Sequence, residues 1–118
     1  MSTPEVADCL FCRILAGEIP SDEVLSTEQT YAFRDLIPRA PTHVLVIPRH
    51  HITDAAALDL SHGDVLAEMF HTAQRVAELE GLEQGYRLVF NVGEDSGNSV
   101  PHLHLHVIGG RLMGWPPG

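Results

Sequence analysis

Apolar positions recur with a helical period in two segments of the chain. In residues 9–16 they fall on one side of an expected helix, at Leu10, Phe11, Ile14 and Leu15, and Gly17 is suited to end it. In residues 61–79 the helical set comprises Val65, Leu66, Met69, Phe70, Ala73, Val76 and Ala77. Ser61 is a candidate N-cap for this segment and Gly81 a candidate stop. We therefore expect one short helix and one long helix.

The remaining apolar runs are short and bounded by turn residues. Residues 23–26 and 30–34 are typical of a hairpin, and residues 42–47 are apolar at consecutive positions, as in a central strand covered on both faces. Two further strands are predicted at 86–91 and 101–108. This order has no repeated strand–helix–strand alternation, so it favours an α+β domain, an antiparallel sheet with the long helix on one face.

Composition limits the classes of function. The chain has 118 residues, of which 44 % are hydrophobic and 19 % charged, as is typical of one globular domain. A formal net charge of −9 argues against nucleic acid as a partner, because phosphates need a basic patch. No apolar stretch approaches the roughly 20 residues that span a bilayer, and residues 1–15 lack a secretory pattern, so we expect a cytoplasmic protein with no membrane partner. Eight histidines outnumber the seven basic residues, which makes histidine chemistry the feature to follow.

Three of the histidines alternate with aliphatic residues. His102, His104 and His106 recur at every second position, which in a strand sends all three imidazoles to one face. An amphipathic strand whose polar face happens to be histidine is the structural alternative. Positions two and four apart on a strand lie roughly 6.6 and 13 Å apart, so one metal ion cannot easily bind all three rings. We therefore expect the rings to have different tasks, with the middle one facing the occupant of a cleft.

The loop before these histidines has features of a phosphate site. Gly93, Gly97 and Ser99 allow close approach of backbone N–H groups and supply a hydroxyl, and Asn91 adds an uncharged donor. A plain turn is the alternative, since acidic residues at 94 and 95 disfavour an anion. The position of the loop directly before the histidines favours the phosphate site.

The two cysteines, Cys9 and Cys12, form a C-x-x-C pair. A redox pair, half of a zinc site and two small buried apolar residues are the alternatives. The redox hypothesis needs a preceding strand, and only eight residues come before Cys9. A zinc site needs two further ligands, which the sequence offers only at long range, from His50 or His51 and one of the alternating histidines.

Taken together, these segments resemble the histidine triad (HIT) family, and most closely its nucleotide-binding branch, the purine nucleoside phosphoramidases. The matching stretches are FCRILAGEIP, AFRDLIPRAPTHVLVIPRHHI, GYRLVFNVGEDSGNSVPHLHLHVIGGR and the ending WPPG. The resemblance implies a HIT-like fold with a five-stranded antiparallel sheet, formed by residues 1–118 as a single domain. The ending WPPG points to this branch and away from the dinucleoside polyphosphate hydrolases of the same superfamily.

The resemblance also implies an activity and the residues that perform it. A nucleoside phosphoramidase cleaves the P–N bond of adenosine or guanosine 5′-phosphoramidates through a covalent nucleotidyl-histidine, which maps onto His104. Around the phosphate we then expect His106, His43, Asn91, Gly97 and Ser99, with Ser99 also beside the leaving amine. Asp35 is expected on the ribose, and Leu10, Phe11, Ile14, Ile19, Phe33 and Leu36 around the purine. The structural alternatives are a turn cap for Asp35, core positions for Phe11, Ile14 and Phe33, and a satisfied core histidine for His43.

Zinc and dimerisation are further implications of the resemblance. Some bacterial relatives bind a structural zinc through residues that map onto Cys9, Cys12, His51 and His102. The family forms homodimers in which two sheets join edge to edge into one continuous sheet, with the long helices packed together. The tail, residues 112–118, is then expected to reach the partner subunit and to place Trp115 at the partner's site. A dinucleoside polyphosphate hydrolase, or a nucleotide-binding or zinc-stabilised interaction module without catalysis, are the alternative functions.

Overall fold

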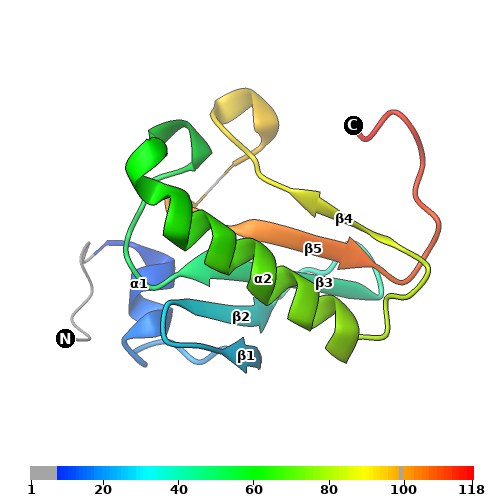
Figure 1. Cartoon of the computed structure of the whole chain (residues 1–118), viewed down its shortest axis with the longest axis horizontal. Coiled ribbons are helices and arrows are strands. Elements are labelled where there is room, and N and C mark those ends of the chain that lie inside the picture. Colours follow the sequence, from blue (N-terminus) through cyan, green and yellow to red (C-terminus); the bar gives the residue numbers. More distant parts are fainter. Residues whose placement is uncertain (1–7, 99) are drawn as a thin grey trace.

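The computed structural model describes residues 8–98 and 100–118. Its five strands form one antiparallel sheet in the order β1-β2-β3-β5-β4 (Figure 1). The strands are β1 (Glu23–Ser26), β2 (Thr30–Arg34), β3 (Thr42–Pro48), β4 (Tyr86–Val89) and β5 (Leu105–Gly109), and the helices are α1 (Leu10–Leu15) and α2 (Gly63–Leu79). The predicted α+β architecture, with a short helix, a long helix and a central third strand, is confirmed.

Strand β3 is buried at every position because both faces of the sheet are covered. Val44 and Val46 belong to the core under α2, which crosses one face of the sheet in Figure 1. Leu45 and Ile47, which alternate with them, pack with Phe11 and the two cysteines of the α1 region. The consecutive apolar residues of β3 therefore divide between two cores, one for each helix.

The last strand is shorter than the predicted 101–108, because β5 begins only at Leu105. The alternation of faces persists upstream, since Leu103 joins Leu105 and Val107 in the α2 core. Near the end of the β3–β5 ladder, two histidine side chains donate hydrogen bonds to backbone carbonyls. His102 Nε2–H donates to the Pro48 carbonyl at 3.0 Å, and His104 Nδ1–H donates to the His102 carbonyl at 2.7 Å. The ladder consequently ends at the pair Val46–Leu105.

The start of the long helix also differs from the prediction. Residues Leu60–His62 form a separate turn of 3₁₀ helix, and α2 follows from Gly63 with His62 as its N-cap residue. Ser61 is not the cap, because its N–H donates to Asp59 Oδ1 at 2.8 Å and Asp59 caps the 3₁₀ turn. His62 Nδ1 in turn accepts from the Asp59 N–H at 3.0 Å, so this ring closes the same turn. Gly81, at φ +69°, follows the end of α2 as predicted.

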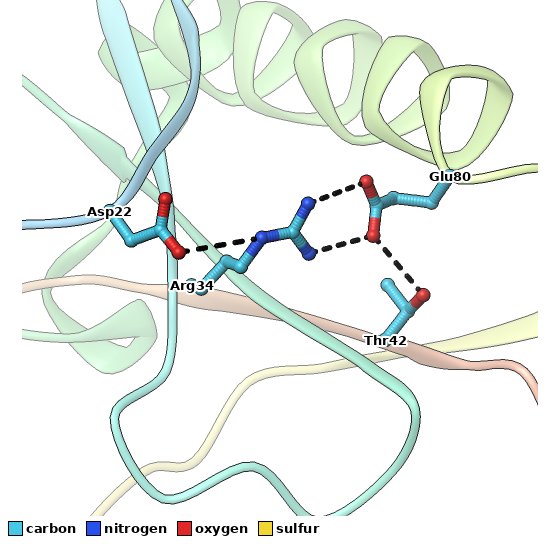
Figure 2. Close-up of polar contacts among 4 residues, drawn as sticks. All are labelled: Asp22, Arg34, Thr42 and Glu80. Carbon is cyan, nitrogen blue, oxygen red and sulfur yellow. Dashed lines mark hydrogen bonds and ion pairs between the residues drawn. The ribbon is translucent and has the colours of Figure 1, made fainter.

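An ion pair joins the end of α2 to the sheet (Figure 2). The Arg34 guanidinium donates to both carboxylate oxygens of Glu80, at 2.7 and 2.9 Å, and its Nε lies 3.7 Å from Asp22. The Thr42 hydroxyl donates to Glu80 at 3.3 Å. These contacts hold the pKa of Glu80 below its usual value, first through the hydrogen bonds from Arg34. The carboxylate at the end of α2 therefore links β2 and β3.

The tail leaves β5 and runs past the edge strand β4 (Figure 1). The Arg87 guanidinium donates to the Gly114 carbonyl and lies 5.9 Å from the centre of the Trp115 ring. Trp115 is 83 % exposed despite this contact. None of the helices among the described residues is both long and apolar enough to cross a membrane.

Candidate nucleotide and metal sites

A cavity of about 370 Å³ opens beside the histidines. Eleven of the residues that the sequence assigned to the nucleotide line it: Leu10, Phe11, Ile14, Ile19, Phe33, Asp35, Leu36, Asn91, Gly97, His104 and His106. His43 and Gly93 do not. We call it the nucleotide cavity. A larger hollow of about 670 Å³, lined by residues such as Leu82 and Met113, has no histidine, cysteine or acid in its walls. The side chains capable of chemistry are therefore gathered at the smaller cavity.

Phe11 stands between the cavity wall and the core. Its ring centroid lies 5.4 Å from that of Phe33 and 5.3 Å from that of His104, both in edge-to-face geometry. Phe11 and Phe33 are each 5 % exposed and belong to the core under α1. The core hypothesis for Phe11 and Phe33 is therefore confirmed. One wall of the cavity is the surface of that core, and a purine bound against it stays a prediction.

His104 has a fixed ring orientation. Its Nδ1 lies 2.7 Å from the His102 carbonyl oxygen, which can only accept, so Nδ1 carries the proton. In the neutral ring Nε2 then keeps its lone pair. The ring lines the nucleotide cavity, so a nucleophilic nitrogen is presented to whatever binds there.

His43 and His106 form a hydrogen-bonded pair beside it. His43 Nδ1 accepts the Arg39 N–H at 3.0 Å, so the neutral His43 ring carries its proton on Nε2. This Nε2–H donates to His106 Nδ1 at 2.9 Å, so the neutral His106 ring carries its proton on Nε2, 3.4 Å from Asn91 Nδ2. Both of these nitrogens are donors and cannot bond to each other, so both are available to an anionic oxygen.

Burial keeps both rings of this pair uncharged near neutral pH. The pKa of His106 falls from its ordinary value of 6.5 to about 4, first because of burial and then because of the neighbouring His104 and His43. The pKa of His43 is also lowered, chiefly by burial, against the opposing charge of Asp35. Neutral imidazoles can donate and accept hydrogen bonds at once, so the pair is suited to hold and move one proton.

Asp35 serves two purposes at the edge of the cavity. Its Oδ1 accepts the Ile37 N–H at 2.9 Å, which is the turn cap foreseen as a structural alternative. Its Oδ2 lies 3.5 Å from His43 Nε2, and the residue also lines the nucleotide cavity. Capping therefore fixes the carboxylate where it can still accept hydrogen bonds from a ligand.

The described residues of the glycine loop line the cavity in part. Gly97 and Asn98 line the cavity, whereas Gly93 does not. Both glycines have positive φ, +80° at Gly93 and +83° at Gly97, on either side of a short 3₁₀ turn. Ser99, predicted at the phosphate and the leaving amine, lies outside the described residues.

Sequence reasoning missed eight residues of the cavity wall: Pro20, Ser21, Asp22, Arg34, Ile37, Leu45, Asn98 and Val100. Asn98 precedes Ser99 in the glycine loop, and Ile37 follows Leu36. Leu36 is 92 % and Ile37 66 % exposed, and two consecutive exposed aliphatic residues are an available signal of a binding surface. Trp115 does not line the cavity of its own chain, and its place at a partner's site stays a prediction.

The four residues assigned to zinc are brought together on the other side of Phe11. Ligand atoms of Cys9, Cys12, His51 and His102 all lie within 4.8 Å of one another. His102 Nδ1 is 3.2 Å from Cys9 Sγ and 3.2 Å from His51 Nδ1, and His51 Nδ1 is 3.4 Å from Cys12 Sγ. A tetrahedral zinc with bonds of about 2.0–2.3 Å requires separations of about 3.3–3.8 Å between its ligand atoms. The cluster is therefore close to the size that zinc requires.

The orientation of His102 also fits a metal ligand. Its Nε2–H donates to the Pro48 carbonyl, so the neutral ring presents the Nδ1 lone pair to the two sulfurs. His102 is fully buried and both cysteines are nearly so. Two sulfurs and two imidazole nitrogens form a complete S₂N₂ set, which is typical of structural zinc.

Comparisons with known proteins agree with the geometry. The chain is 42 % identical over 119 residues to a protein named Adenylylsulfatase HINT1 from Arabidopsis thaliana, covering 99 % of this chain and 81 % of that protein. It is 43 % identical over 113 residues to a 14 kDa zinc-binding protein from Brassica juncea, covering 94 % of this chain and 100 % of that protein. A crystal structure of a HIT family hydrolase from Legionella pneumophila Philadelphia 1 superposes with a TM-score of 0.92 at 48 % identity, covering 94 % of this chain and 100 % of that chain. Because the HIT domain model also matches residues 16–113, the chain belongs to the HIT family.

Proposed function

We propose that this protein is a nucleotidyl hydrolase that cleaves the P–N bond of purine nucleoside 5′-phosphoramidates. The observation that carries the proposal is the hydrogen bond from His104 Nδ1 to the His102 carbonyl, which leaves Nε2 of His104 free to attack phosphorus. The hydrolase and HINT1 names of relatives at 48 % and 42 % identity support the same class of reaction.

The reaction proceeds in two displacements at phosphorus. The Nε2 lone pair of His104 forms the N–P bond while the bond from phosphorus to the leaving amine breaks, and the amine takes up one proton, whose delivery the family resemblance assigns to Ser99. Water then attacks the nucleotidyl-histidine and gives up one proton, which replaces the one that left with the amine. The nucleoside monophosphate leaves, and His104 is regenerated. His106 Nε2–H and the Asn91 amide donate to the phosphoryl oxygens, whose charge grows in both transition states.

The purine and ribose have matching surroundings. The apolar walls around Phe11, Ile14 and Phe33 offer burial for a purine, and Asp35 offers acceptors for ribose hydroxyls. A second candidate substrate is adenylyl sulfate, because the Arabidopsis relative is named an adenylylsulfatase. The same nucleophile serves it, with sulfate in place of the amine as the leaving group.

The test is a substrate panel with mass spectrometry of the trapped intermediate. The panel holds an adenosine phosphoramidate, adenylyl sulfate and a diadenosine polyphosphate. We expect release of AMP, an AMP adduct on His104, and a loss of at least about 10³-fold in His104→Gln. His71→Asn, on the exposed side of α2, is the matched control and should keep full activity. Full turnover by His104→Gln contradicts the proposal, and tight AMP binding without turnover selects the non-catalytic module.

We further propose that Cys9, Cys12, His51 and His102 hold a structural zinc. Zinc, when bound, cross-links α1 to the segments after β3 and before β5. The zinc-binding name of the Brassica relative supports this assignment. His102 then links the two sites, because its ring faces the metal cluster while its carbonyl orients His104.

We also propose a cytoplasmic homodimer of a single HIT domain, residues 1–118, in which β4 pairs with its symmetry copy and residues 112–118 reach the partner's nucleotide cavity. β4 is an edge strand, with Tyr86 37 % and Leu88 36 % exposed. Leu79 on α2 is 62 % exposed, and Trp115, whose ring lies beside the Arg87 guanidinium, is 83 % exposed. Unpaired edges and exposed apolar residues of this kind are typical of an interface.

A further inference from the structure

A second hollow lies on the far side of His106 from the purine walls. It has a volume of about 380 Å³ and shares Asp35, Ile37, Asn91 and His106 with the nucleotide cavity. Its own walls are Arg39, His43, Val89 and Ile108, and His104 is not among them. We call this hollow the side cavity. Since His106 lines both hollows, the reacting phosphate can lie at their junction.

The backbone of Arg39 is fixed at both of its polar groups. Its N–H donates to His43 Nδ1 at 3.0 Å, and its carbonyl accepts from the Arg111 guanidinium at 3.0 Å. The side chain, by contrast, is exposed and has no hydrogen-bond or ion-pair partner within residues 8–98 and 100–118. Its positive charge is close enough to contribute to the lowered pKa of His43, after the larger effect of burial. Arg39 is thus a cation without a partner among the described residues, on an anchored backbone beside His43 and His106.

The direction of the displacement points the leaving group into the side cavity. An in-line attack by His104 expels the leaving group on the side of phosphorus opposite to His104. His104, His106 and Ile108 follow one another on one face of the chain, and only the last two line the side cavity. The leaving group therefore departs over His106 toward Ile108 and Arg39.

We propose that the side cavity receives the leaving group and that Arg39 makes this chain prefer leaving groups with an anionic group, a carboxylate or a sulfate, at or next to the scissile bond. This inference rests on the proposed nucleotidyl hydrolase function. The net charge of −9 repels anions at long range, and Asp35 adds a negative charge in the same walls. A local cation is needed to offset both, and Arg39 is the one permanently cationic side chain among the described residues of the side cavity.

The test compares substrates that differ only in this charge. The adenosine 5′-phosphoramidate of glycine carries a carboxylate, and that of glycinamide is its neutral isostere, while adenylyl sulfate forms the third arm. We expect Arg39→Gln to lower kcat/KM for the glycine conjugate about fivefold more than for the glycinamide conjugate, mainly by raising KM. This factor is typical of the loss of one ion pair, here between Arg39 and the carboxylate, that is partly exposed to solvent. Arg39→Lys should recover part of the difference. Arg75→Gln, on the exposed face of α2, is the matched control and should change neither value.

The ratio of the kcat/KM values for the two conjugates distinguishes direct contact of Arg39 with the leaving group from an indirect effect through His43. If Arg39→Gln changes both conjugates equally, Arg39 acts through His43 and the proposal is overturned. A response confined to the glycine conjugate identifies the carboxylate as the group recognised, and a response confined to adenylyl sulfate identifies the sulfate. No turnover of any substrate by the unmodified protein refutes the hydrolase itself, whereas turnover with an unchanged ratio refutes only the role of Arg39.

Discussion

Removing the ion pair between Arg34 and Glu80 should destabilise the fold. Arg34 ends β2 and lines the nucleotide cavity together with Phe33 and Asp35, and Glu80 is the C-cap residue of α2. The perturbation is a double-mutant cycle with Arg34→Met, Glu80→Gln and the double variant. The methionine keeps the apolar stem of Arg34, and the glutamine keeps the size of Glu80 and an acceptor for Thr42.

The expected magnitude follows from the exposure of the two groups. Exposed ion pairs contribute about 0.2–1 kcal/mol, whereas removing one partner of a buried pair costs about 3–5 kcal/mol. The Arg34 side chain is 40 % and that of Glu80 15 % exposed, with two hydrogen bonds at 2.7 and 2.9 Å. We place the coupling free energy between these limits, at about 2 kcal/mol. For a chain of this length a loss of that size lowers Tm by about 8 °C.

The assay is urea unfolding followed by circular dichroism, at one protein concentration and at pH 7, with kcat/KM measured on each variant. Because the pKa of Glu80 is lowered in the folded state, its stabilisation is present above its usual pKa of 4.5 and is lost as the pH falls below it. Arg34→Met should therefore weaken the dependence of the free energy of unfolding on pH below 4.5. A coupling free energy below about 0.5 kcal/mol would show that solvent screens the pair and would refute this reasoning.

Three further predictions concern the metal, the histidine pair and the assembly. Cys12→Ser should abolish zinc binding, measured by elemental analysis of freshly purified protein, and lower the free energy of unfolding by at least about 3 kcal/mol; an unaltered fold with no zinc in the unmodified protein contradicts the metal site. The pKa of His106 is about 4 in the folded state and 6.5 ordinarily, so between these pH values the unfolded state binds more protons than the folded state. The free energy of unfolding should therefore fall as the pH drops from 6.5 toward 4. In NMR spectra the ring of His106 should show no titration between pH 5 and 8. Leu88→Asp on the β4 edge should yield monomers in sedimentation analysis, while Leu60→Asp, fully exposed beside α2, should not; a monomeric unmodified protein refutes the dimer.

Local pattern was sufficient for most of the fold. The hairpin at 23–34, the doubly covered strand β3 and the length of α2 follow from hydrophobic period and from glycines that end helices. The hydrophobic pattern predicted the wrong start of the last strand, where histidine side chains, instead of backbone N–H groups, donate to backbone carbonyls. The alternating residues 101–104 have the period of a strand, yet His102 and His104 donate to carbonyls near the end of β5, and the strand begins only at Leu105.

The available chemistry can be read from residue types alone: alternating histidines on one face, a C-x-x-C pair, and glycines before the histidines. Which atoms meet depends on the tertiary structure. His43 pairs with His106 across neighbouring strands, and His51 meets His102 beside the cysteines. The tautomers of His43, His102 and His104 depend on the Arg39 N–H and on the carbonyls of Pro48 and His102. Such backbone partners leave no trace in residue type, because every residue but proline offers the same N–H and every residue the same carbonyl, and only the fold selects among them.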